Sequence, residues 1–192
     1  MSVQTQPRIS PEEYLAAERA SEAKHEYLAG EVFAMVGASW EHNLIVTNLV
    51  RELSGQLKDR PCRVYASDMR VGVEVADLYA YPDIVIGCGD DHFADTHFDT
   101  LLNPTVVIEV LSPSTEAYDR GEKFAHYRRL ESLTDYLLVS QNRRRIEHFH
   151  READGRWLLF EAAGAEAALE IPSIGCQLVL AEVYDKVEID LL

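Results

Sequence analysis

Hydrophobic and polar residues follow two different periods along this chain. From residue 40 to residue 57, apolar side chains recur every three or four positions, and this spacing predicts an amphipathic helix facing the core. Residues 105–111 instead form an almost continuous β-branched and aliphatic run, which is typical of a strand covered on both faces. Glu109 interrupts the middle of that run. A carboxylate buried there is costly unless a metal, a cation or hydrogen bonds compensate its charge.

Capping and turn signals delimit the remaining elements. Ser10 and Glu13, with a proline between them, form a capping box that begins a helix reaching about residue 21. Asp119, with Glu122 three positions later, is expected to cap a helix that follows the glutamate-bearing strand. The other predicted strands are residues 25–28 and 31–36, which form a hairpin, then 63–66, 69–75, 81–86, 136–140, 145–151, 157–162 and 168–171, with a short helix at 180–187.

The order of these elements favours an α/β domain. Helices alternate with groups of strands, which argues for a layered structure with a mixed sheet. Strand 105–111, the helix after it and strand 136–140 predict a right-handed β-α-β crossover. The chain has 192 residues, no internal repeat and no low-complexity linker. We therefore expect a single domain at residues 10–192 after a tail at residues 1–9.

The overall charge limits the possible partners. A formal net charge of −15 opposes broad contact with a phosphate polymer. A local basic patch beside a divalent cation can still attract one. Arg143, Arg144 and Arg145 form the densest basic cluster, and they are either an exposed hairpin edge or a DNA contact.

The cysteines and the first residues bear on the compartment. Cys62, Cys88 and Cys176 are odd in number and scattered, so they match neither a disulfide framework nor a paired-cysteine zinc site. This pattern indicates a reducing cytosol. The polar first residues lack the apolar core of a signal peptide, and no apolar run approaches membrane-spanning length. We expect a cytoplasmic protein without a membrane partner.

Three residues form the candidate site. Asp83 stands at the entrance of strand 81–86, and if that strand neighbours the one carrying Glu109, both carboxylates can point into one notch. Such oxygen ligands suit Mg²⁺ or Mn²⁺. Lys123 can hold a water or a phosphate oxygen there, and Tyr127, four positions later, shares its helix face. The alternatives are a turn role for Asp83 and a buried ion pair between Glu109 and Lys123.

Other polar residues are weaker candidates. His42 opens the helix at residues 40–57 and either reaches the notch or simply caps and packs. Asp68 is either a neighbour of the site or a turn residue. His148 and His150 alternate on one strand face, and we expect them to be exposed on an edge strand rather than to bind a metal.

Several segments around these residues carry a family resemblance. The chain resembles the Uma-type endonucleases, a bacterial family placed in the PD-(D/E)XK nuclease superfamily, over roughly residues 10–150. The segment Val-Ile-Glu-Val-Leu-Ser-Pro-Ser-Thr at residues 107–115 is its most specific part. The other matching pieces are residues 27–32, 37–39 with His42, 67–71, 82–86, Asp119, Lys123, Tyr127 and 135–139.

The resemblance implies a fold and an activity. The implied fold is a restriction-endonuclease-like core, a mixed β-sheet flanked by helices, here with an extra N-terminal hairpin and C-terminal antiparallel strands. The implied activity is metal-dependent hydrolysis of phosphodiester bonds in DNA, with Asp83 and Glu109 binding Mg²⁺ or Mn²⁺. In the superfamily, a lysine normally follows the glutamate by two positions, but this chain has Leu111 there. The resemblance implies that the Uma-type family carries this lysine on the next helix, where this chain has Lys123.

A second reading of the same features remains open. The negative charge and the leucine at position 111 favour a catalytically inactive nuclease-fold protein that acts in binding or assembly. In either case, unpaired edge strands are natural pairing surfaces, and we expect a homodimer with a two-fold axis.

Overall fold

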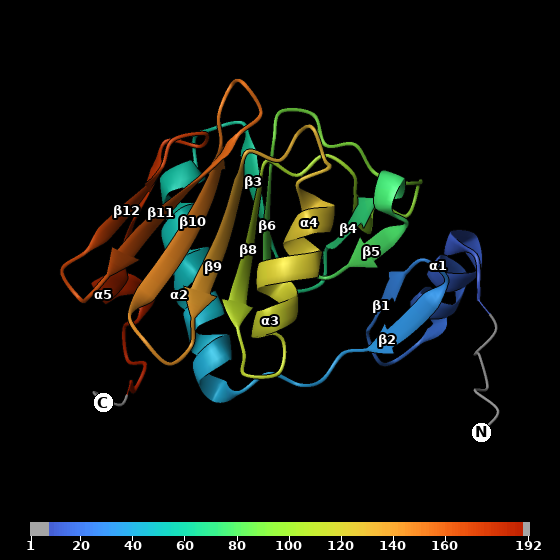
Figure 1. Cartoon of the computed structure of the whole chain (residues 1–192), viewed down its shortest axis with the longest axis horizontal. Coiled ribbons are helices and arrows are strands. Elements are labelled where there is room, and N and C mark those ends of the chain that lie inside the picture. The colour runs from blue at the N-terminus through green and yellow to red at the C-terminus, as the bar shows by residue number, and fades with distance from the viewer. Residues whose placement is uncertain (1–7, 190–192) are drawn as a thin grey trace.

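The computed structural model describes residues 8–189 and has the predicted α/β class, with mixed sheets flanked by helices (Figure 1). The helices are α1 (Pro11–Ala20), α2 (Trp40–Leu57), α3 (Glu116–Tyr118), α4 (Phe124–Tyr127) and α5 (Leu180–Val183), with a 3-10 turn at Glu74–Ala76 and a π-helical turn at Asp119–Lys123. The strands are β1 (His25–Leu28), β2 (Glu31–Ala34), β3 (Cys62–Ala66), β4 (Arg70–Val73), β5 (Leu78–Ala80), β6 (Ile84–Cys88), β7 (Thr100–Leu101), β8 (Val106–Leu111), β9 (Asp135–Ser140), β10 (Arg145–Arg151), β11 (Trp157–Ala163), β12 (Ala168–Ile171) and β13 (Cys176–Val179).

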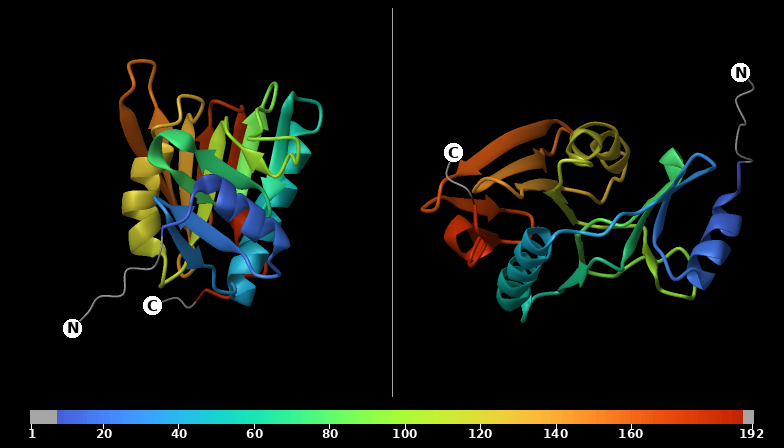
Figure 2. Two further views of the ribbon diagram at one scale, coloured as in Figure 1. Left: turned by 90° about the vertical axis from the view of Figure 1, so that its right-hand side faces the viewer. Right: turned by 90° about the horizontal axis from the view of Figure 1, so that it is seen from below.

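Two larger sheets and a hairpin make up the structure. The six-stranded sheet has the order β11-β10-β9-β8-β6-β3, and β8 and β9 are parallel, as the predicted β-α-β unit requires. The predicted N-terminal hairpin, β1–β2, is part of a five-stranded sheet of order β2-β1-β5-β4-β7, and β12 pairs with β13. Seen from below, α1 with that hairpin and the C-terminal strands lie at opposite ends of the molecule (Figure 2).

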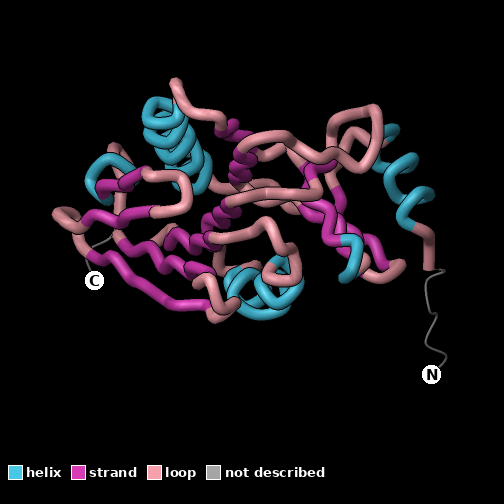
Figure 3. Tube along the Cα trace, turned by 90° about the horizontal axis from the view of Figure 1, so that it is seen from above, coloured by secondary structure: helices cyan, strands magenta, loops and turns pink. Residues whose placement is uncertain are grey.

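Both faces of the six-stranded sheet are covered. Figure 3 shows α2 on one face and the α3–α4 segment on the other. The helical spacing predicted for residues 40–57 is confirmed, because α2 buries Ile45, Leu49 and Leu53 in one core cluster with strand residues of the sheet. All six residues of β8 are buried, Glu109 included, which confirms a strand covered on both faces. Within the described range, no helix has the length and apolar character that crossing a membrane would require.

The capping box of α1 is confirmed. Ser10 Oγ accepts a hydrogen bond from Glu13 N, and the Glu13 carboxylate accepts one from Ser10 N. Ile9 packs against the cluster that contains Tyr14, and its amide donates to Gly30 O. Of the predicted tail, residues 1–7 lie outside the described residues.

The helix after β8 begins earlier than predicted. It starts at Glu116, whose amide donates to Ser112 O, and Asp119 is therefore not its cap. The Asp119 carboxylate instead lies in the interior, within the π-helical turn. Tyr136 Oη donates to Asp119 O at 2.9 Å, so this carbonyl also has a partner outside the helix. Single π-helical turns of this kind are frequent at functional sites.

The expectation about the cysteines was wrong. Cys62 on β3 lies directly opposite Cys88 on β6, and the two form a disulfide, while Cys176 is free and buried. The pairing is set by strand register across 26 positions of sequence, which no short spacing motif reveals. The inference of a reducing compartment therefore loses its support from the cysteines.

Candidate active site

Asp83 and Glu109 are brought together by the register of two strands. β6 and β8 are antiparallel, with Ile84 opposite Ile108. Asp83, one residue before β6, therefore comes opposite Glu109, and residues directly opposite one another share a face of a sheet. Asp83 Oδ2 accepts a hydrogen bond from Val110 N at 2.7 Å, which fixes the carboxylate against the end of β8.

Lys123 extends from the helical segment into this notch. Its Nζ atom lies 2.9 Å from Glu109 Oε1 and 3.0 Å from Glu26 Oε1, with Asp119 Oδ1 at 3.7 Å. The lysine is only 5% exposed. The ammonium group is therefore surrounded by carboxylates and is largely shielded from solvent.

Glu26 belongs to this cluster although the sequence did not single it out. It lies on β1, and its Oε1 atom also accepts a hydrogen bond from Tyr81 N at 3.2 Å. Because β1 is part of the five-stranded sheet, Glu26 approaches Lys123 from a different layer than Glu109 does. Its one sequence signal is its place directly before the family segment at residues 27–32.

The cluster has an excess of negative charge. Three carboxylates, those of Glu26, Glu109 and Asp119, contact a single lysine, and a fourth, that of Asp83, acts on Glu109. Burial, together with the three other acids, raises the pKa of Glu109 well above its usual value despite the attraction of Lys123. Burial likewise raises the pKa of Asp119. Burial alone would lower the pKa of Lys123, but the surrounding acids outweigh it and raise that pKa well above the usual value.

His42 reaches the same notch from the first turn of α2. Ser39 caps this helix by accepting a hydrogen bond from His42 N, and the ring Nε2 lies 3.2 Å from Asp83 Oδ2. Burial alone would lower the pKa of His42, but the Asp83 carboxylate outweighs this and raises it. The Nδ1 atom is buried and finds no hydrogen-bond partner among residues 8–189.

Tyr127 lies beside Lys123 on the interior face of the helical segment. Its hydroxyl is buried and has no hydrogen-bond partner in the described part of the chain. Its ring lies 5.9 Å from that of Tyr136, centroid to centroid. Burial raises the pKa of Tyr127 well above its usual value. The hydroxyl is therefore a neutral donor without an acceptor, next to the lysine.

Asp68 does not join the acids. Its carboxylate is 84% exposed on the turn between β3 and β4, where it forms an ion pair with Lys24. The preceding residue, Ser67, has a φ of 53° and donates its amide to Asp83 O, so the turn itself touches the Asp83 backbone. The structure thus gives Asp68 the turn role and an ion pair at the surface.

The donor set fits a hard divalent cation. Asp83 and Glu109 offer carboxylate oxygens from neighbouring strands, the ligand type that Mg²⁺ and Mn²⁺ prefer. Glu109 Oε1 is buried and makes no hydrogen bond of acceptable geometry within the described residues, although Lys123 Nζ is close to it. A buried oxygen with unused acceptor capacity, in a cluster short of positive charge, is what such a cation would complete.

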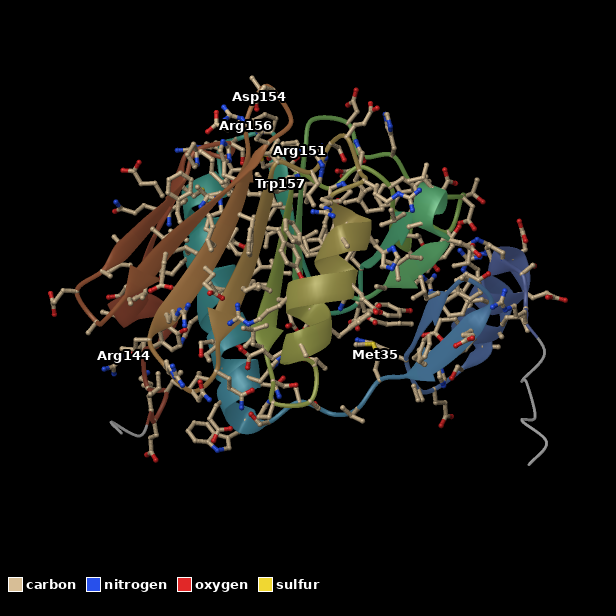
Figure 4. All side chains as sticks on the ribbon, in the orientation of Figure 1. Met35, Arg144, Arg151, Asp154, Arg156 and Trp157 are labelled. Atoms are coloured by element: carbon tan, nitrogen blue, oxygen red, sulfur yellow. A yellow bond between two sulfur atoms is a disulfide. The ribbon has the colours of Figure 1, made fainter. Side chains whose placement is uncertain are left out.

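Part of the densest basic cluster is already paired with acidic side chains. Arg145 is bound to Glu147 and Glu161, each at 2.7 Å, so much of its charge is already paired. In Figure 4, Arg144 lies at the opposite end of the C-terminal strands from Arg151.

Two cavities of about 100 and 120 Å³ lie at the ends of β8 and β9. Both are lined by Leu111, Glu116, Ser140 and Asn142. The smaller one is also lined by Arg120, Arg143 and Arg145.

The prediction for the two strand histidines was wrong in its premise. β10 is not an edge strand, because β11 pairs along its outer side. His148 is consequently buried, and His150 is half-buried. Both rings contact Asp135, a residue that the sequence had not suggested as a ligand.

Comparisons with known proteins point to one family. A family profile described as "Uma2: Putative restriction endonuclease" matches residues 11–181. Two uncharacterized proteins of Synechocystis sp. are similar to this chain. The first is 38% identical over 178 residues, which cover 93% of this chain and 92% of that protein. The second is 35% identical over 170 residues, which cover 88% of this chain and 96% of that protein.

A solved structure shares the fold. The crystal structure of a protein from Anabaena variabilis, described as a putative nuclease belonging to DUF820, superimposes with a TM-score of 0.74. The alignment covers 94% of this chain and 99% of that one, at 17% sequence identity. This likeness confirms the predicted nuclease-like fold.

Proposed function

This chain belongs to the Uma2 family, and we propose that it is a metal-dependent endonuclease that hydrolyses phosphodiester bonds in DNA. The observation that carries the proposal is the excess of acid at the candidate site. Three carboxylates contact one lysine in a largely buried notch, and Asp83 adds a fourth acid beside Glu109, so the acids outnumber the cations there. A divalent cation and the phosphate it attracts would restore the balance.

Asp83 and Glu109 are the proposed ligands of Mg²⁺ or Mn²⁺. When bound, the ion would supply Lewis-acid chemistry, polarising a phosphoryl oxygen and lowering the pKa of a coordinated water. Val110 N holds Asp83 in place by donating to its Oδ2 atom, and His42 contacts the same oxygen. His42 is therefore a positioning residue for Asp83 in this proposal.

Lys123 is the proposed catalytic cation. Glu26, Glu109 and Asp119 keep its ammonium group charged and hold it in place. From there it would orient the attacking water or stabilise the negative charge that grows on the phosphoryl oxygens. Tyr127, whose hydroxyl has no acceptor among the described residues, can donate a hydrogen bond on the same side.

A cleavage assay tests this function. Purified protein is incubated with plasmid and with single-stranded DNA, in Mg²⁺ or Mn²⁺. We expect cleavage by the unmodified chain, loss of cleavage in Asp83→Ala and Glu109→Ala, and full cleavage in Asp68→Ala, the exposed control. Absence of cleavage under every condition, or equal cleavage by all four proteins, rejects the proposal.

One observation favours a second candidate, a catalytically inactive nuclease-fold protein acting in binding or assembly. Lys123 already contacts Glu109 directly, and Leu111 occupies the position where the superfamily has its lysine. The acids could then be structural partners of the lysine alone. Calorimetric titration with Mn²⁺ separates the two: millimolar or tighter binding that Glu109→Gln abolishes supports the enzyme, and no heat supports the inactive protein.

We also propose a two-fold homodimer that forms along β11. This strand ends the six-stranded sheet, and three large apolar residues on it are exposed, namely Leu158, Leu159 and Phe160. Unpaired edges with apolar side chains are natural pairing surfaces. Light scattering that gives a mass near 21.7 kDa at every concentration refutes the dimer.

We propose a cytoplasmic location because the proposed substrate, DNA, is accessible there. Cell fractionation tests this location.

A further inference from the structure

We propose that Asp135, His148 and His150 form a second metal site, which binds a first-row divalent transition metal such as Zn²⁺. The three ligand atoms lie within 4.8 Å of one another. They come from the start of β9 and from the middle and end of β10. The site is separate from the acids of the proposed nuclease centre and does not depend on that function.

The strand register builds this cluster. His150 lies opposite Asp135 and His148 lies opposite Leu137, so all three polar side chains project from one face of the sheet. His148 Nε2 lies 2.6 Å and His150 Nδ1 lies 2.7 Å from the same atom, Asp135 Oδ1. Two imidazole nitrogens and one carboxylate oxygen therefore converge on a single point.

The second oxygen of Asp135 is held away from the histidines. Asp135 Oδ2 accepts hydrogen bonds from Thr134 Oγ1, at 3.0 Å, and from Ser173 Oγ. Burial alone would raise the pKa of Asp135, but the contacts with His148, Ser173 and His150 outweigh it and lower that pKa. The carboxylate is thus oriented by surrounding groups, as the ligands of metal sites are.

The donor set distinguishes this site from the acid cluster. Two imidazoles with one carboxylate are ligands of Zn²⁺ and related ions, whereas Mg²⁺ prefers oxygen donors alone. Ligands at about 2.0–2.1 Å from a tetrahedral Zn²⁺ lie roughly 3.3 Å apart. The two contacts here are shorter than that by less than about 1 Å, so a small outward rotation of the rings admits the ion.

The position of the cluster allows the ion to enter. The Asp135 and His148 side chains are buried, but that of His150 is 22% exposed, and Leu158 of the neighbouring strand is exposed as well. The ion can therefore arrive from the side of His150, where a fourth ligand position opens toward solvent. A bound ion would link β9 to β10 and stabilise the C-terminal half of the sheet.

The two sites lie on opposite faces of the same sheet. Leu137 lies two residues after Asp135 on β9, so the two side chains share a face of the sheet, and Leu137 packs in the core cluster on the α2 side. Val107 and Leu111 lie two residues before and after Glu109 on β8, so they share its face of the sheet. Both pack in the core cluster that contains residues of α4. Each site can therefore be loaded or altered without touching the other.

Metal titration of the whole chain tests the proposal. After treatment with a chelator, the protein is titrated with CoCl₂ and then with ZnCl₂, both unmodified and as Glu109→Gln. In Glu109→Gln we expect one equivalent of Co²⁺ to bind, with a visible absorption band typical of tetrahedral coordination, and we expect the same band in the unmodified protein, whose acids can take up further Co²⁺. We expect Zn²⁺ to displace it and to raise the midpoint of thermal unfolding.

Matched variants locate the ion. In the Glu109→Gln background, His150→Gln, at the rim, and His148→Gln are each expected to weaken Co²⁺ binding at least tenfold. His97→Gln, an exposed histidine in the loop before β7, is expected to leave it unchanged. Failure of the folded, unmodified chain to bind Co²⁺ or Zn²⁺ at millimolar concentration overturns the proposal. Undiminished binding in His150→Gln overturns it equally, even if His148→Gln does not fold.

Discussion

Replacing Lys123 by methionine is the sharpest test of how the candidate site works. Methionine keeps most of the side chain's length and apolar volume but removes the ammonium group. That group lies 2.9 Å from Glu109 and 3.0 Å from Glu26. Each contact has a gross attraction of about 5–6 kcal/mol at an effective dielectric constant near 20. Most of this attraction offsets the desolvation of the charges, so the net loss expected on removing one buried partner is about 3–5 kcal/mol.

The loss should depend on pH in a definite direction. The pKa values of Glu109 and Asp119 are already raised by burial and by their acidic neighbours, and removing the lysine raises them further. Such groups keep their protons in the folded state while the unfolded chain releases them, so folding stability falls as pH rises above about 4–4.5. Lys123→Met is therefore expected to lose the full amount at pH 8 and clearly less at pH 5.

Urea unfolding at both pH values, with and without Mg²⁺, measures this effect. Mg²⁺ should recover most of the stability at pH 8, because a cation bound by Asp83 and Glu109 compensates the same charge. Lys58→Met, an exposed lysine at the end of α2, is the matched control and should change little. If Lys123→Met is as stable as the control at pH 8 without metal, the ion-pair argument is wrong. If it is destabilised but cleaves DNA normally with Mg²⁺, Lys123 is not catalytic.

Three further perturbations have defined outcomes. Glu109→Gln should lose Mg²⁺ binding at the acids and cleavage, but it should be at least as stable as the parent at pH 8, because its amide cannot ionise. Urea unfolding at pH 5 and 8 should show a flatter pH dependence. Reducing the Cys62–Cys88 disulfide, or making Cys62→Ser, should cost about 3–4 kcal/mol by the loop-entropy estimate for 26 positions, and unchanged unfolding with and without reductant contradicts this. Leu49→Ala, in the buried face of α2, should cost about 2–5 kcal/mol in thermal unfolding, and a loss below 1 kcal/mol would show that the core is not packed as described.

Elements with a long period or a strong local signal could be predicted from the sequence. α2 has the predicted bounds because eighteen residues repeat one apolar face, and α1 begins at its capping box because Ser10 and Glu13 act within a single turn. Asp83 and Glu109 could be paired because two continuous apolar strands of one sheet were recognisable. In each case the element is specified either by contacts within one turn or by a run of apolar residues that is visible in the sequence.

Other features that depend on register between distant segments, unlike the Asp83–Glu109 pair, were missed. The disulfide, the approach of Glu26 to Lys123 and the convergence of His148 and His150 on Asp135 all join segments whose spacing carries no motif. Short strands such as β5 and β7 have too few residues to show a period. These contacts follow from how the sheets pack, which propensity and pattern alone do not determine.

The lysine that contacts Glu109 is carried by the helical segment at position 123, whereas position 111 on β8 is a leucine. Leu111 shares its strand face with Glu109, but it is buried in an apolar cluster with Phe124 and Tyr136. The π-helical turn instead ends at Lys123 and places its ammonium group beside Glu109, with Glu26 and Asp119 as additional partners. Because electrostatic stabilisation depends on where the charge lies rather than on which element carries it, a leucine at position 111 is compatible with catalysis by Lys123. The acids around Lys123 are the feature that a catalytic lysine at this position would require.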